Sequence, residues 1–161
     1  MVSAVQSGSA TSGPIWFIDN LARILVDGEA SNDAIAIVEL TGRQGDMPPL
    51  HIHHREDETF VVLDGSLALF LPGGRRIDLA VGEAAVAPKG IAHVYRVESQ
   101  QARWLAITAP AGFDAFVREA AEPAGSAVLP PPGREHDAAR LHEIAARFGI
   151  ELLGPPGTYP A

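Results

Sequence analysis

Short apolar runs separated by turn residues fill the first two thirds of the chain. Leu67, Leu69 and Leu71 stand at every second position, as one face of a half-buried strand requires. Asp64-Gly65, which lies just before them, is typical of a tight turn. Many short strands at this spacing predict an all-β sandwich or barrel with antiparallel pairing. The runs that predict strands are residues 16–18, 23–26, 34–40, 51–53, 59–63, 66–71, 76–79, 84–87, 94–97 and 103–108.

Towards the C-terminus the pattern changes to a helical period. Apolar residues recur at i, i+3, i+4 and i+7 in two segments, residues 113–120 and 141–148. Asp137 and Gly149 are a plausible N-cap and C-cap for the second segment, and a proline-rich link precedes it. We therefore expect two short C-terminal α-helices that pack on the surface of the β domain. The predicted organisation is a disordered tail at 1–13, a β-barrel domain at 14–110 and a helical extension at 111–161.

Composition narrows the possible functions. The chain has 161 residues, of which 20 are acidic and 12 basic, so its formal net charge is −8. This charge argues against nucleic acid as a partner, because the phosphate backbone would be repelled. No apolar run approaches the length of a membrane span, and the N-terminus lacks the pattern of a signal peptide, so we expect a cytoplasmic protein without a membrane partner.

The absence of cysteine limits the chemistry further. Disulfides, thiolate zinc sites, iron–sulfur clusters and a cysteine nucleophile are excluded, and any metal must be held by His, Asp or Glu. His51 and His53 point to the same side of a strand, whereas His54 points to the other. Glu58 can return to the first side if the chain turns slightly, and His93 follows a tight turn far along the chain. Three imidazoles and one carboxylate suit a divalent first-row transition metal.

Several neighbouring residues have competing interpretations. Glu56 could replace Glu58 as the carboxylate ligand, although residues 55–57 are expected to form a solvated turn. Strand alternation places Tyr95 on the same face as His93, which makes it a candidate for the wall of the pocket. We expect every acidic residue other than Glu58 to be solvated. The histidines expected at the surface are His54, His136 and His142.

Two stretches of the chain resemble the two conserved motifs of the cupin family. Residues 45–65 resemble the first motif, which is Gly, five residues, His-x-His, three or four residues, Glu, six residues and Gly. Residues 82–93 resemble the second, which is Gly, five residues, Pro-x-Gly, two residues and His. Val97 stands where the second motif usually ends in Asn, a position that is not a metal ligand. The resemblance implies a single conical β-barrel with a metal ion inside, bound by His51, His53, Glu58 and His93.

Through the same four residues, and through the strand that runs into a helix at residues 108–119, the chain resembles the small single-cupin quercetin 2,3-dioxygenases of bacteria. That resemblance implies a flavonol or similar aromatic substrate, dioxygen as the second substrate, and Glu58 as the catalytic base. It also implies one divalent ion (Fe, Ni, Mn or Co, with Zn or Cu as alternatives) and a homodimer. Two other functions stay open. One is a cyclase, isomerase or decarboxylase that uses the metal without dioxygen, and the other is a non-catalytic binding protein.

Overall fold

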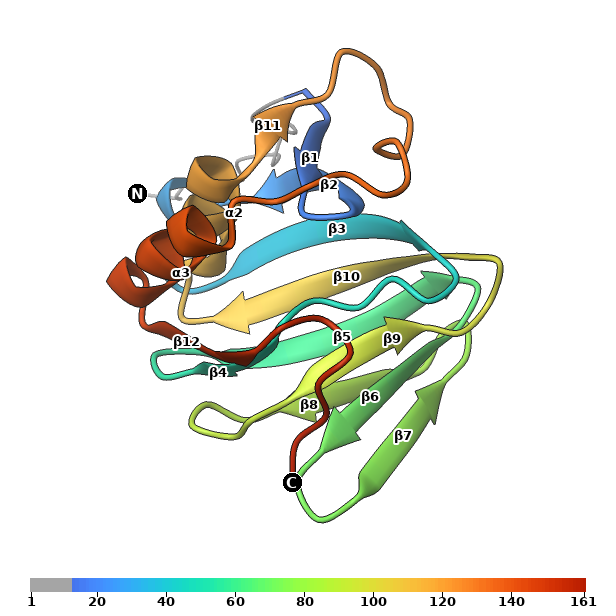
Figure 1. Ribbon diagram of the computed structural model, residues 1–161. Helices are drawn as coiled ribbons and strands as arrows, with labels where there is room; N and C mark the ends of the chain where they lie inside the picture. Colours follow the sequence, from blue (N-terminus) through green and yellow to red (C-terminus); the bar gives the residue numbers. More distant parts are fainter. Residues whose placement is uncertain (1–12) are drawn as a thin grey trace.

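The computed structural model describes residues 13–161, in which twelve strands are arranged in three antiparallel sheets (Figure 1). The strands are β1 (Ile15–Phe17), β2 (Asn20–Val26), β3 (Ala36–Arg43), β4 (Leu50–His53), β5 (Asp57–Asp64), β6 (Leu67–Leu71), β7 (Arg75–Leu79), β8 (Ala84–Ala87), β9 (Val94–Val97), β10 (Gln101–Ala109), β11 (Glu122–Pro123) and β12 (Ile150–Gly154). The helices are α1 (Gly28–Ser31), α2 (Phe113–Ala120) and α3 (Ala138–Arg147).

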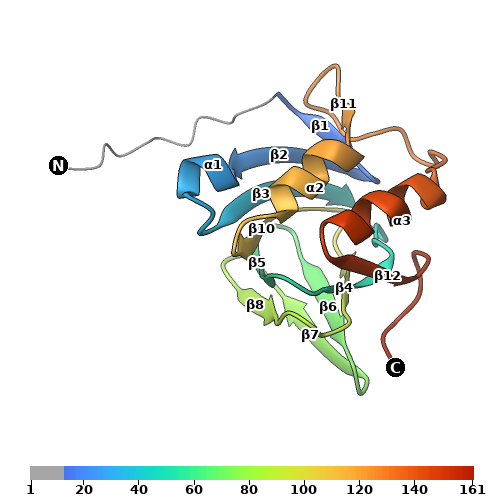
Figure 2. The same ribbon diagram turned by 90° about the vertical axis from the view of Figure 1, so that its left-hand side faces the viewer.

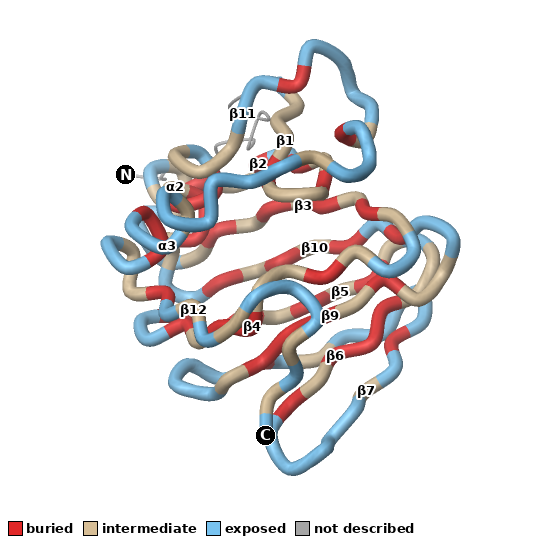
Figure 3. The backbone as a smooth tube through the Cα atoms, in the orientation of Figure 1, coloured by how far each residue is buried: buried red, intermediate tan, exposed pale blue. Residues whose placement is uncertain are grey.

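The largest sheet forms one wall of the barrel. Its strand order is β11-β1-β2-β3-β10-β5-β8. Buried and partly exposed residues alternate along β3, β5 and β10, and Figure 3 shows this alternation as red and tan segments. The inward positions carry large side chains, among them Leu40, Phe60, Val62 and Trp104, which are all buried. Because strand side chains alternate in direction, these residues fill the barrel from one side.

Two smaller sheets form the opposite wall. One pairs β12 with β4, and the other has the order β7-β6-β9. An isolated bridge between His51 and His93 joins the two, since β4 and the residue before β9 exchange backbone hydrogen bonds there. Leu67, Leu69 and Val97 point inward from this wall and are buried. The barrel core therefore lies between the large sheet and the two small ones.

The turn between β5 and β6 explains one glycine of the first motif. Gly65 has a φ of +71°, and a Cβ atom there would lie only 2.2 Å from the carbonyl oxygen of Gln101. Any side chain would therefore collide with β10, so this position requires glycine.

The C-terminal segment closes one end of the barrel. Figure 2 shows α2 and α3 side by side over this end, with β12 returning to the barrel wall. Asp137 caps α3 by accepting a hydrogen bond from the backbone N–H of Arg140, as the sequence predicts. Phe116 and Ile144 are buried on the inner faces of the two helices. The segment after α3 then forms β12, which pairs with β4.

The predicted all-β barrel with two C-terminal helices is confirmed. The sequence did not predict α1, β11 or β12, which are all short. Residues 1–12 of the predicted tail lie outside the described residues. Within residues 13–161, no helix combines the length and the apolar character needed to cross a bilayer.

Candidate metal centre

Four side chains meet at the closed end of the barrel. His51 and His53 come from β4, Glu58 from β5, and His93 from the turn before β9. All four are buried, and His93 has no exposed surface. One potential ligand atom from each lies within 4.8 Å of all the others. The structure thus brings together all four residues that the sequence singled out.

Backbone carbonyls hold two of the histidines in one tautomer. Nδ1 of His51 lies 2.7 Å from the carbonyl oxygen of Pro49, and Nδ1 of His93 lies 3.0 Å from that of Ile91. A carbonyl oxygen can only accept, so each Nδ1 must carry the proton. Nε2 of each ring is therefore left to face the centre, where it is available to a metal ion.

His53 is held by a side chain. Its Nδ1 lies 2.9 Å from Oε1 of Glu56, while its Nε2 lies 3.2 Å from Oε2 of Glu58. The same Glu58 oxygen lies 3.0 Å from Nε2 of His93 and 4.0 Å from Nε2 of His51. Three ring nitrogens therefore surround one carboxylate oxygen. This donor set fits a divalent transition-metal ion, which takes imidazole and carboxylate ligands.

Burial and the neighbouring charges shift the pKa values of three groups in the cluster. Burial lowers the pKa of His51 to about 4 despite the opposing effect of Glu58. Burial also disfavours the charged form of His53, but the carboxylates of Glu58 and Glu56 outweigh it and raise the pKa to about 9. For Glu58, burial acts to raise the pKa, and the facing histidines lower it well below its ordinary value. Without a metal ion, the His53 ring therefore carries a proton on both nitrogens at neutral pH. Its positive charge lies between the carboxylates of Glu56 and Glu58.

Metal binding is expected to tighten with rising pH. The proton on Nε2 of His53 must leave before that atom can act as a ligand, so protons compete with the metal below the His53 pKa of about 9. The apparent affinity should rise about tenfold per pH unit between roughly pH 7 and 8.5. Calorimetric titration with Zn²⁺ in two buffers of different ionisation enthalpy should show at least one proton released per ion. An affinity that does not change over this range would contradict the assignment of His53.

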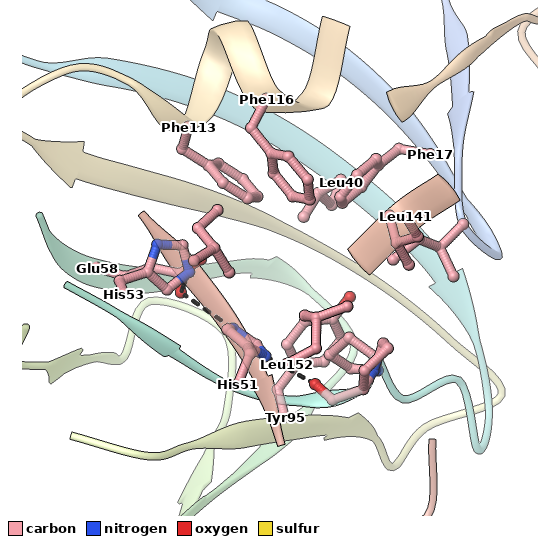
Figure 4. Close-up of a pocket in the computed structure, with 14 residues that line it drawn as sticks. Phe17, Leu40, His51, His53, Glu58, Tyr95, Phe113, Phe116, Leu141 and Leu152 are labelled. Atoms are coloured by element: carbon pink, nitrogen blue, oxygen red, sulfur yellow. Dashed lines mark hydrogen bonds and ion pairs between the residues drawn. The ribbon is translucent and has the colours of Figure 1, made fainter. Parts of the chain in front are cut away.

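An apolar pocket adjoins the four residues. Figure 4 shows the rings of Phe17, Phe113 and Phe116 on one side of the pocket, facing His51 and His53. Other walls come from Ile18, Leu40, Tyr95, Leu141, Ile150 and Leu152. The edge-to-face contacts of Phe17 with Phe113 and Phe116, at ring separations of 6.0 and 5.5 Å, hold the three rings together. The pocket is therefore mainly apolar, apart from the side where it meets the histidines and Glu58.

Tyr95 lines this pocket, as the strand alternation predicts. Its hydroxyl donates a hydrogen bond of 2.7 Å to Oδ1 of Asn20. Burial, followed by the charge of Glu58, raises the pKa of Tyr95 well above its ordinary value, so the hydroxyl stays neutral. The histidines expected at the surface (His54, His136 and His142) are exposed.

Two expectations about acidic residues are wrong. Glu56 is only 2% exposed, so the expected solvated turn at residues 55–57 points its middle residue inward. Glu56 is not a member of the group around Glu58, because it contacts the opposite nitrogen of the His53 ring. Asp27 and Asp114 are buried as well, so Glu58 is not the only inward-facing acid. The sequence also did not reveal that Ile150 and Leu152 of β12 reach the pocket.

The comparisons with known proteins agree with this geometry. Residues 38–108 match the family model described as a cupin domain. This segment, which contains all four residues of the buried group, is therefore similar to a cupin domain. A quercetin 2,3-dioxygenase of Bacillus subtilis (strain 168) is 34% identical over 134 residues, which are 83% of this chain and 40% of the relative. The chain spans less than half the length of the curated relatives it matches.

Solved structures share the fold. KdgF from Halomonas sp. superposes with a TM-score of 0.54 at 20% identity, over 61% of this chain and 86% of that one. The polyketide cyclase RemF from Streptomyces resistomycificus superposes with a TM-score of 0.51 at 24% identity, over 68% and 80% of the two chains. At these identities the likeness concerns the fold alone.

Proposed function

We propose that this protein is a cupin and a metal-dependent dioxygenase that acts on a flavonol-like or other aromatic enol. The observation that carries the proposal is the buried group of His51, His53, Glu58 and His93 at the side of a pocket walled by phenylalanine rings. The similarity to a bacterial quercetin 2,3-dioxygenase supports it. An aromatic substrate would lie against these rings, and its acidic hydroxyl would point towards the histidines.

The four residues would hold one divalent ion, for which we propose Fe, Ni, Mn or Co. Such an ion supplies a Lewis acid that favours the ionised form of an enol, and redox chemistry suited to dioxygen. The protein contributes three ring nitrogens and one carboxylate in a buried site, so the ligands lose little freedom when the ion binds. Both homodimer formation and a cytoplasmic location stay predictions from the sequence.

Glu58 is the proposed base. Its carboxylate is kept ionised by the facing histidines, and Oε2 lies on the side of the ring nitrogens. From there it can accept the proton of an enol hydroxyl that enters beside it. The rings of Phe17, Phe113 and Phe116 exclude water from the reacting face of the substrate. Tyr95, whose hydroxyl is bonded to Asn20, adds a polar side chain to this wall.

An oxygen-dependent turnover assay tests this function. Protein loaded separately with Fe, Ni, Mn or Co should consume quercetin in air, seen as loss of the flavonol absorbance, with matching uptake of dioxygen. Glu58→Gln should lower the turnover per bound metal ion by about 100- to 10,000-fold, since the base is lost. Metal content is measured in both proteins so that lost metal is not mistaken for lost chemistry.

Other outcomes of the same assay would overturn the proposal. Equal turnover without dioxygen would indicate a cyclase, isomerase or decarboxylase. Tight binding of the flavonol without turnover with any of the four metals would indicate a binding protein.

A further inference from the structure

The three histidines of the metal centre are not held in the same way. Backbone carbonyls accept the Nδ1 protons of His51 and His93, at 2.7 and 3.0 Å. Each carbonyl belongs to a residue two positions earlier in the chain, so the backbone itself sets these two rings. His53 alone has a charged side chain at Nδ1, because Oε1 of Glu56 lies 2.9 Å away. The tautomer and orientation of the His53 ring therefore depend on the side chain at position 56.

We propose that Glu56 is a positioning residue of the metal centre, which holds the Nδ1 proton of His53 and so presents Nε2 of that ring to the metal ion. The proposal rests on the assignment of His53 as a ligand under the proposed function, and it does not depend on the reaction. A carboxylate at this place fixes the tautomer, as a backbone carbonyl does for the other two rings, and its negative charge also makes the ring a stronger donor at Nε2.

The burial of Glu56 indicates that the contact is specific. Its side chain is 3% exposed, and a carboxylate at this depth is costly unless it is paired. The His53 ring supplies a partner at hydrogen-bond distance. The other carboxylate oxygen faces the start of α2, where a Cβ atom on Gly112 would lie 3.8 Å from it. The positive end of a helix favours a negative charge at this place.

Phe113 connects the metal centre to the pocket through its contact with His53. Phe113, the first residue of α2, packs against the ring of His53 at a centroid separation of 5.6 Å. His53 is thus held at Nδ1 by Glu56 and over its ring by a residue of the pocket wall. A change of Glu56 should therefore act on the metal site through His53, and leave the backbone-held rings of His51 and His93 in place.

The chain offers a matched control in the next histidine. Nε2 of His54 lies 2.7 Å from Oε2 of Glu151, which repeats the His–Glu pair of His53 and Glu56. Both side chains of this second pair are about half exposed, and neither belongs to the buried group. Glu151→Gln therefore removes the same charge beside a histidine without touching the proposed centre.

The test measures Zn²⁺ affinity by competition with a chelator for the wild type, Glu56→Gln, Glu56→Ala and Glu151→Gln. Glu56→Ala should weaken binding about 10- to 100-fold. Glu56→Gln should bind with intermediate affinity, because the amide oxygen can still accept the Nδ1 proton but carries no charge. Glu151→Gln should bind like the wild type. Nitrogen NMR of the histidine rings in the Zn²⁺-loaded proteins should show the Nδ1 proton of His53 protected in the wild type and in Glu56→Gln.

Several results would overturn the proposal. Equal Zn²⁺ affinity in wild type and Glu56→Ala would do so, as would a fall in thermal stability of both Glu56 variants with unchanged affinity. If Glu56→Ala does not fold, the affinity and the ring-nitrogen signals of Glu56→Gln decide. A wild type that binds Zn²⁺ tightly but never oxidises a flavonol contradicts only the proposed function. A wild type that binds no Zn²⁺ contradicts both.

Discussion

Replacing His53 with alanine is expected to weaken metal binding by about 100- to 1,000-fold, because one of the four proposed ligands is lost from a binding free energy of roughly 10–16 kcal/mol. The loss should be this large because His53 is buried and its Nε2 faces Glu58 at 3.2 Å. The variant also leaves the buried carboxylate of Glu56 without its partner at Nδ1. Equilibrium dialysis with Co²⁺ or Zn²⁺ measures the effect.

The matched control is His54→Ala, at the neighbouring position. His54 is exposed and bonded to Glu151 on the outside of the barrel. This variant should keep the metal affinity of the wild type. If the two alanine variants bind metal equally well, the proposed ligand set is wrong, whatever the protein does. Thermal unfolding of both proteins shows whether the His53 variant is folded when its affinity is measured.

Trp104→Ala is expected to destabilise the fold more than any exposed substitution. Trp104 has no exposed surface, pairs with Leu40 and Val62 across the sheet, and lies 5.0 Å from the ring of Tyr95. Removing an indole from a packed core costs about 3–5 kcal/mol in unfolding free energy. For a domain of this size the melting temperature should fall by about 6–20 °C. Denaturant unfolding and calorimetry both measure this change.

Trp104→Phe separates packing from hydrogen bonding. Among the described residues, the indole N–H of Trp104 has no hydrogen-bond partner. Phenylalanine therefore loses no polar contact and keeps part of the volume, so we expect a cost of roughly 1–2 kcal/mol. A phenylalanine variant as unstable as the alanine variant would contradict this account and indicate a polar role for the indole.

The proposed ligands were predictable because their spacing reflects local geometry. His51 and His53 share a face through strand alternation, which needs no knowledge of the rest of the fold. The glycine of the first motif at residue 65 marks a turn where only glycine fits. The resemblance of both motifs to cupins then linked His93 to this group, although it lies 40 residues after His53.

Glu56 was not predictable from alternation, because the chain bends between β4 and β5. Residues 54 and 55 are a bend, and alternation resumes one residue out of step, so Glu56 and Glu58 both face inward. Strict alternation from His53 would have placed both of them outside. Only the bend and the packing of α2 decide that one carboxylate meets Nε2 of His53 and the other Nδ1.

The C-terminal strand was missed for a related reason. β12 has five residues, and its partner β4 lies about a hundred residues earlier in the chain. Short strands acquire most of their stability from the partner and from burial, neither of which is local. Leu152 therefore joins the pocket wall by tertiary pairing alone.

By itself, the sequence predicted the all-β class and the two C-terminal helices, because each depends on a repeat of a few residues, and its two cupin-like motifs predicted the four residues of the candidate metal centre. The tertiary structure alone decided which carboxylate contacts which nitrogen of His53 and which rings line the pocket. It alone also decided that the C-terminal segment completes the pocket wall. These features depend on contacts between segments far apart in the chain, and the free energy of such contacts comes from burial, which local pattern does not reveal.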